Sequence, residues 1–148
     1  MFVHDREIDM LGDKVWESTG KVIGTRVLPG DDYRYVKVET TIEYSGKLLG
    51  KDGMGMGTFV AFERVPGQLY AEGQGIVGTA DGEGAIWNGH GVGSAGGDEG
   101  GMTMSIRYSV AYQAGANGPL AALNGALVIG EFETKSDDTF TDVAWFWQ

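Results

Sequence analysis

The chain has 148 residues, no cysteine and a formal net charge of −10 at pH 7. This length is typical of one domain with its own core, and the missing thiols exclude disulfides and thiolate chemistry. Nucleic acid and anionic membranes are not expected as partners, because both bind basic surfaces. The lack of cysteine is compatible with the cytoplasmic location that we expect. No apolar run approaches the about 18 residues of a membrane-spanning helix.

Glycine is unusually frequent, with 26 residues, against a usual share of about 7%. The glycines lie among Val, Ile, Trp, Tyr and Phe, which indicates turns and bent strands rather than disorder. At most one helical turn is expected, in 120–127. Residues 45–56 are expected to form a connection, either a flexible loop or a second short hairpin. Strands are expected within 7–28 (two, with a break at 17–20), 33–44, 57–65, 70–94 (a hairpin), 102–112, 126–134 and 139–148.

The hairpin in 70–94 is the most distinctive stretch. Asp81-Gly82 predicts a two-residue type I′ turn, since both residues tolerate the positive φ that this turn requires. Pairing outward from this turn places Gly73 opposite His90 and Gly75 opposite Asn88. A one-residue shift of the turn would exchange the faces of one strand relative to the other.

About eight to ten short strands favour a barrel or a sandwich. We expect one all-β domain over residues 1–148, an antiparallel up-and-down barrel, with a β-sandwich as the alternative. Glycine within strands permits the coiling that closure requires, and closure removes exposed sheet edges.

Three segments carry a resemblance to known barrels: LYAEGQGIV, IWNGHGVG and MTMSIRYSVAYQ. With them the chain resembles small barrels of the calycin (lipocalin) or allene oxide cyclase-like type, and a group of uncharacterised bacterial proteins. This resemblance implies a fold and brings no activity with it. The lipocalin Gly-x-Trp signature is absent, since Lys14-Val15 precede Trp16.

His90 is the strongest single candidate for a functional residue. The predicted register places it on one face with Asn88, and we expect this pair to contact a ligand inside the barrel. There histidine could act as acid or base near neutral pH and asparagine could orient an oxygen. A histidine that is hydrogen-bonded in the core or exposed on the outer wall is the alternative.

Further candidates come from alternating strands. Tyr108, Tyr112 and Met104 share one face of 102–112, and Tyr44 ends the apolar face of 33–44. They line a ligand pocket if the barrel is hollow and fill the core if it is not. No cofactor is expected, because a turn rather than a helix follows the G-x-G-x-x-G match at 73–78. No metal site is expected either, since zinc and EF-hand spacings are missing, and no catalytic residue can be named.

Three functions remain open. The first is binding of a small, largely apolar molecule inside the barrel, and the second is an isomerase or cyclase that uses the same cavity. The third is a filled, structural barrel that forms a homo-oligomer through an aromatic patch near Trp145 and Trp147. Usual ligand pockets measure about 300 Å³ or more, so a cavity below ~100 Å³ would rule out both ligand hypotheses for ligands of usual size.

Overall fold

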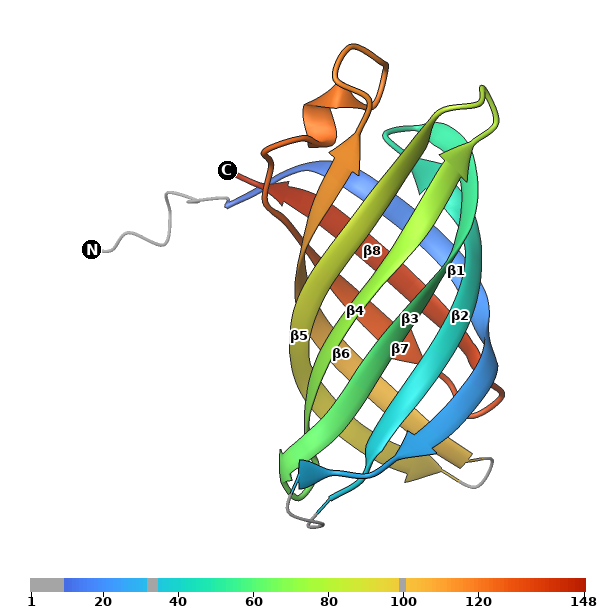
Figure 1. Cartoon of the computed structure of the whole chain (residues 1–148), viewed down its shortest axis with the longest axis vertical. Helices are drawn as coiled ribbons and strands as arrows, with labels where there is room; N and C mark the ends of the chain where they lie inside the picture. The colour runs from blue at the N-terminus through green and yellow to red at the C-terminus, as the bar shows by residue number, and fades with distance from the viewer. Residues whose placement is uncertain (1–9, 32–34, 99–100) are drawn as a thin grey trace, which may run out of the picture.

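The chain folds into a closed antiparallel barrel, described by a computed structural model for residues 10–31, 35–98 and 101–148 (Figure 1). A one-turn helix, η3 (Ala121–Leu123), lies between the sixth and seventh strands. The strands in chain order are β1 (Leu11–Leu28), β2 (Lys37–Leu48), β3 (Lys51–Val65), β4 (Gln68–Thr79), β5 (Gly84–Asp98), β6 (Gly101–Ala114), β7 (Val128–Thr134) and β8 (Thr139–Trp147).

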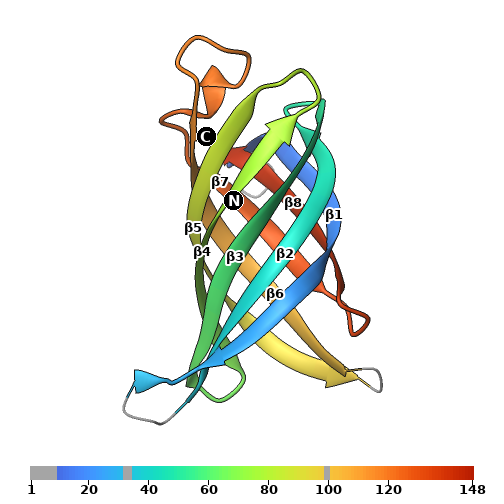
Figure 2. The ribbon, with the colours of Figure 1, turned by 45° about the vertical axis from the view of Figure 1, so that its right-hand side comes forward.

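Each strand pairs with its neighbour in the chain, and β8 returns to pair with β1, which closes the sheet. Figure 2 shows the strands steeply inclined around the barrel, as closure requires. The predicted up-and-down barrel is therefore confirmed, and the sandwich alternative is wrong.

The first strand is one continuous element of 18 residues rather than two strands. The expected break at 17–20 pairs on both sides, with Thr19 opposite Ser45 of β2 and Thr141 of β8. Glycine is required at position 20, because a Cβ there would lie 2.5 Å from the ring of Phe140. The sequence that was interpreted as a break thus makes room for a buried aromatic ring.

The connection expected at 45–56 is a tight hairpin, the second of the two alternatives. Leu48 pairs with Lys51, so the loop has only Leu49 and Gly50, with φ of 49° and 81°. Two positive φ values are the mark of a type I′ turn, and leucine rarely adopts them. The Leu49 N–H donates to the Val15 carbonyl at 2.8 Å, which helps to hold this conformation.

The hairpin of β4 and β5 has a longer loop than predicted, and this shifts its register. Only Gly82 has a positive φ, and the Thr79 N–H donates to the Glu83 carbonyl at 2.8 Å. The loop is thus Ala80–Asp81–Gly82, the three-residue type with glycine in the left-handed region. His90 consequently lies opposite Glu72, and Asn88 lies opposite Gln74.

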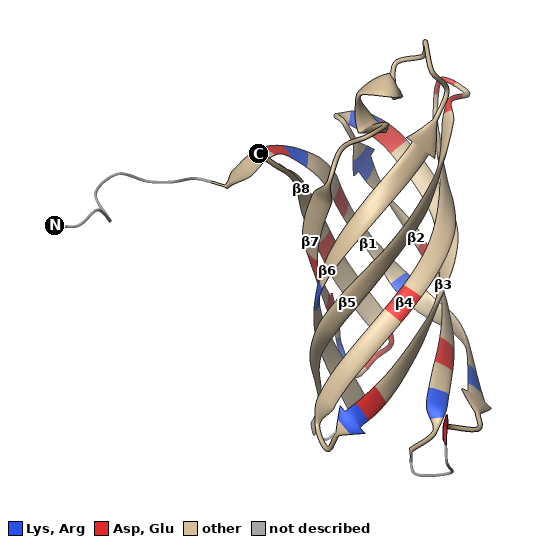
Figure 3. Ribbon diagram, turned by 60° about the vertical axis from the view of Figure 1, so that its left-hand side comes forward, with Lys and Arg blue, Asp and Glu red and all other residues tan. Residues whose placement is uncertain are grey.

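The interior is apolar and one end of the barrel is covered. Leu120 and Leu123, at the η3 turn, are 1% and 0% exposed and join the core cluster; Figure 1 shows this turn beyond the end of β6. Figure 3 shows the charged residues scattered over the strands and turns of the barrel. Few of them lie on β4 and β5. In the described part of the chain, no helix is long and apolar enough to span a membrane.

Candidate functional site

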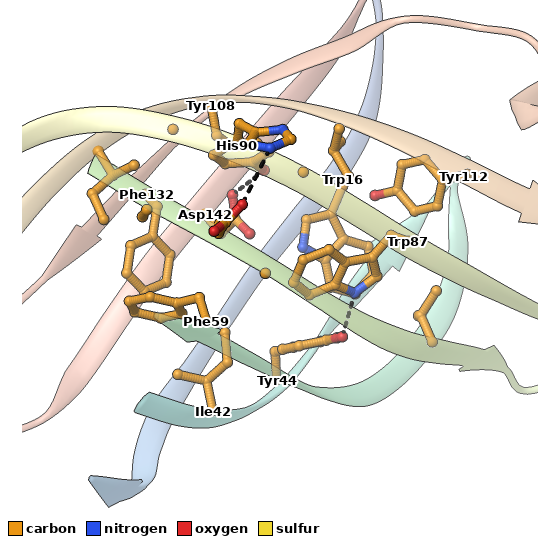
Figure 4. Close-up of a pocket in the computed structure, with 18 residues that line it drawn as sticks. Trp16, Ile42, Tyr44, Phe59, Trp87, His90, Tyr108, Tyr112, Phe132 and Asp142 are labelled. Carbon is orange, nitrogen blue, oxygen red and sulfur yellow. Dashed lines mark hydrogen bonds and ion pairs between the residues drawn. The ribbon is translucent and has the colours of Figure 1, made fainter. Parts of the chain in front are cut away.

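A cavity of about 90 Å³ lies within the barrel (Figure 4). Its volume lies below the ~100 Å³ limit set above and far below the usual pocket size. This volume counts against both ligand hypotheses as they were stated, because a ligand of ordinary size does not fit in this cavity; it leaves room only for a compact molecule. The aromatic side chains that line the cavity are Trp16, Tyr44, Phe59, Trp87, Tyr108, Tyr112 and Phe132.

Asp142 is the acidic side chain inside this cavity. Alternation along β8 turns Phe140, Asp142 and Ala144 inward, and both flanking residues are fully buried. The Tyr108 hydroxyl donates to Asp142 Oδ1 at 2.5 Å, and Trp16 provides a second hydrogen bond. Burial raises the pKa of Asp142 to about 7, although the two hydrogen bonds lower it. A carboxyl group in a pocket whose pKa is raised close to neutral pH is a common feature of functional sites.

A hydroxyl group on β1, the strand next to β8, is buried with no hydrogen-bond partner among the described residues. Ser18 of β1 lies directly opposite Asp142, is 5% exposed, and its Oγ has no hydrogen-bond partner within the described residues. Unpaired buried polar groups are rare in native proteins. The barrel interior at this level therefore holds more hydrogen-bonding capacity than the protein itself uses.

Two tyrosines of β6 lie beside the carboxyl. Tyr108 lies against Gly130 of β7, where any Cβ would overlap the phenol ring. Burial raises the pKa of both Tyr108 and Tyr112, and the charge of Asp142 adds to this effect. Tyr112 lines the cavity, and Figure 4 shows no hydrogen bond between its hydroxyl and the other lining residues. This hydroxyl is thus free to bind a ligand.

The opposite wall is an aromatic pair whose hydrogen bonds are satisfied. Trp87 Nε1 donates to the Tyr44 hydroxyl at 2.8 Å, and this hydroxyl donates to the Ile76 carbonyl at 2.7 Å. Burial raises the pKa of Tyr44 to about 12. Trp16 meets Tyr44 edge-on, with ring centroids 5.5 Å apart. This wall supplies aromatic surface and a fixed phenol rather than an ionisable group near neutral pH.

The structure brings three of the six predicted ligand contacts together: Tyr44, Tyr108 and Tyr112 all line the cavity. Met104 packs against the core but does not line the cavity. His90 and Asn88 do not point into the cavity, and for His90 the alternative of exposure on the outer wall holds. His90 borders the cavity at the glycine-rich wall, yet its side chain is 77% exposed and lies 3.4 Å from Glu72 on the outer face; Asn88 is also exposed. The cause is the one-residue shift at the Ala80–Gly82 loop.

Sequence reasoning missed Asp142, Trp16 and Trp87. The available signal for Asp142 was its place between Phe140 and Ala144 on a strand whose other face carries Trp145 and Trp147. For Trp87, the signal was the glycine opposite it: Gly75 is its cross-strand partner, and a Cβ there would lie 2.5 Å from the indole.

The arrangement can hold a proton, donate hydrogen bonds and enclose an apolar group. Within the described residues, no group of three histidine or acidic side chains is placed to hold a metal ion. What the fold and site define together is an eight-strand antiparallel barrel with a small aromatic cavity around one buried carboxyl.

Comparison with known proteins gives the fold and no activity. No family model matches the chain, and no curated protein matches it in sequence. Among solved structures, the barrel is similar to the crystal structure of a protein of unknown function from Clostridium acetobutylicum ATCC 824, with a TM-score of 0.70. The match covers 95% of this chain and 99% of that chain at 13% identity. Likeness at this identity shows a shared fold alone, and the calycin or allene oxide cyclase-like relationship stays a prediction.

Proposed function

We propose that the barrel binds a small, compact, largely apolar molecule in the cavity around Asp142. The observation that carries the proposal is a buried carboxyl and a Tyr112 hydroxyl with no hydrogen bond to the other lining residues, in a cavity lined mostly by apolar and aromatic groups. A few convergent polar groups in an apolar enclosure are the usual form of a small-molecule site. The volume of about 90 Å³ limits the ligand to a few non-hydrogen atoms.

The proposal replaces the predicted polar contacts and keeps the predicted aromatic ones. Asp142 and Tyr112 take the roles first assigned to His90 and Asn88, because only the former point inward. Tyr44 and Tyr108 remain part of the lining.

A second function is favoured by one observation, the pKa of Asp142 near 7. A general acid or base works best when its pKa lies near the working pH. An isomerase that moves a proton on a compact substrate would use Asp142 in this role, with Tyr112 as hydrogen-bond donor. The filled, structural barrel remains the third alternative; Trp147, which belongs to its predicted contact patch, is 46% exposed.

Thermal unfolding in the presence of small compounds tests binding. A ligand at a hundred times its Kd should stabilise the fold by about 2.7 kcal/mol. Acetone, tert-butanol, acetate and trimethylammonium are suitable probes, with Val110→Phe as the cavity-filling control, because Val110 lines the cavity. Stabilisation of the wild type and not of this variant is expected. If no probe stabilises the wild type, or if the variant responds equally, the ligand does not lie in this cavity.

A further inference from the structure

The cavity contains a carboxyl group and no cation to pair with it. Within the part of the chain that the structure describes, no Lys, Arg or His forms an ion pair with Asp142; its contacts are the neutral donors Tyr108 and Trp16. His90 is the one lining residue that can carry a positive charge, and its side chain lies outside the wall beside Glu72. Buried charges in proteins are normally paired, so the ionised form of Asp142 lacks a partner.

Aromatic rings surround this carboxyl. Trp16, Tyr44, Trp87, Tyr108 and Tyr112 all line the cavity. A cation near an aromatic face is attracted to the ring, and most strongly when both are desolvated. The three phenols stay neutral near pH 7, because their pKa values are raised above the ordinary value for tyrosine. They add aromatic surface without adding negative charge.

We propose that the ligand is a small alkylated ammonium ion, held by the Asp142 carboxylate and the surrounding aromatic rings. This inference rests on the proposed function and names the chemical class of its ligand. A carboxylate pairs with the positive charge, and the rings and aliphatic side chains pack against the alkyl groups. An anion is disfavoured, because it would meet the carboxylate and no inward cation.

The volume of the cavity and the oxygen atoms in its lining narrow the class of ligand further. About 90 Å³ admits a methylated ammonium ion and excludes an extended or aromatic amine. A metal ion such as Ca²⁺ requires six to eight oxygen ligands, and within the described residues no group of three histidine or acidic side chains is placed to hold one. An alkylated ammonium ion requires few acceptors, because most of its surface is apolar.

The direct test compares three probes matched in their number of non-hydrogen atoms: trimethylammonium chloride, acetone and sodium acetate. Binding to the wild type is measured at pH 8 by tryptophan fluorescence and by thermal shift, at constant ionic strength. We expect trimethylammonium to bind at least tenfold more tightly than acetone, and acetate not to bind. Asp142→Asn should weaken the binding of trimethylammonium by roughly a hundredfold, because it removes the charge of the carboxylate. The affinity for acetone should change by no more than about twofold, because the side chain keeps its shape.

The pH dependence gives a second measurement that needs no variant. A cation binds the ionised carboxyl, so its affinity should fall roughly a hundredfold between pH 8 and pH 5 as Asp142 takes up a proton. The groups that face Asp142 are Trp16 and Ser18 of β1, Tyr44 of β2, and Tyr108 and Tyr112 of β6; none of them titrates in this range. Glu72 and His90 border the cavity from the wall, so His90→Ala serves as the control and should keep the same profile.

The outcomes separate this inference from the proposed function. Equal or tighter binding of acetone or acetate, or a cation affinity that Asp142→Asn leaves unchanged, overturns the inference while the cavity remains a ligand site. A cation affinity independent of pH overturns it as well. If none of the probes binds, the proposed function fails together with the inference.

Discussion

The buried carboxyl gives the sharpest prediction, which concerns stability rather than binding. Replacing Asp142 with Asn keeps the shape and an acceptor for Tyr108 and removes the ionisable group. In the wild type, the folded-state pKa is raised from 3.8 to about 7. The unfolded chain therefore releases this proton more readily than the folded chain. The stability contributed by the protonated carboxyl is complete below about pH 4 and is lost as the pH rises towards 7.

The magnitude follows from the size of the pKa shift. A shift from 3.8 to about 7 corresponds to about 4 kcal/mol over the whole range. About 2.5 kcal/mol of this falls between pH 5 and pH 8. Other carboxyl groups also contribute to the pH dependence of unfolding, but their contributions are common to both proteins. The difference between wild type and Asp142→Asn isolates the one carboxyl.

Urea unfolding followed by tryptophan fluorescence at pH 5 and pH 8 provides the assay. Between these pH values, the wild type should lose about 2.5 kcal/mol relative to Asp142→Asn, which should be the more stable protein at pH 8. An equal pH dependence in both proteins would mean that the carboxyl is solvated in the folded state, and the account of the site would be wrong.

Other substitutions test the remaining contacts. Tyr108→Phe removes a hydrogen bond to the carboxylate and should cost about 1.5–3 kcal/mol at pH 8. Tyr112→Phe removes a hydroxyl that has no hydrogen bond to the other lining residues in Figure 4 and should change stability by less than ~0.5 kcal/mol. Urea unfolding measures both. Gly75→Ala places a Cβ 2.5 Å from an indole ring and should cost about 1–3 kcal/mol. Gly78→Ala on the same strand meets only one atom, at 3.8 Å, and is its control; equal losses would refute the packing argument. His90→Ala removes an exposed pair and should change the free energy of unfolding by less than ~0.5 kcal/mol; a larger loss would show that the outer wall depends on this pair.

Strand content and closure could be predicted because they depend on local pattern. The alternation in 102–112 places Tyr108 and Tyr112 on one face, and the structure turns that face inward. The same holds for Tyr44 in β2, where Thr40, Ile42 and Tyr44 are all buried. In such strands the contrast between apolar and polar residues identifies the inner face without knowledge of the turn.

The direction of His90 could not be predicted, because β5 lacks this contrast. Its inner positions are mostly glycine, and its outer positions include Ile86 and Val92, each 54% exposed. The face therefore had to be inferred from the turn, and Asp81-Gly82 fits both a two-residue and a three-residue loop. The Thr79 side chain favours the longer loop by accepting from the Glu83 N–H at 3.2 Å.

Asp142 was missed for a related reason that also explains the cavity. A single acidic residue on a strand is normally a solvent-facing one, so alternation in β8 was interpreted from its tryptophans. Inside the barrel, glycines at positions 75 and 130 allow the rings of Trp87 and Tyr108 to lie close against the wall. The rings fill most of the lumen, and the remaining volume lies around the carboxyl. The glycines that let these rings lie against the wall therefore set the volume that remains around the carboxyl.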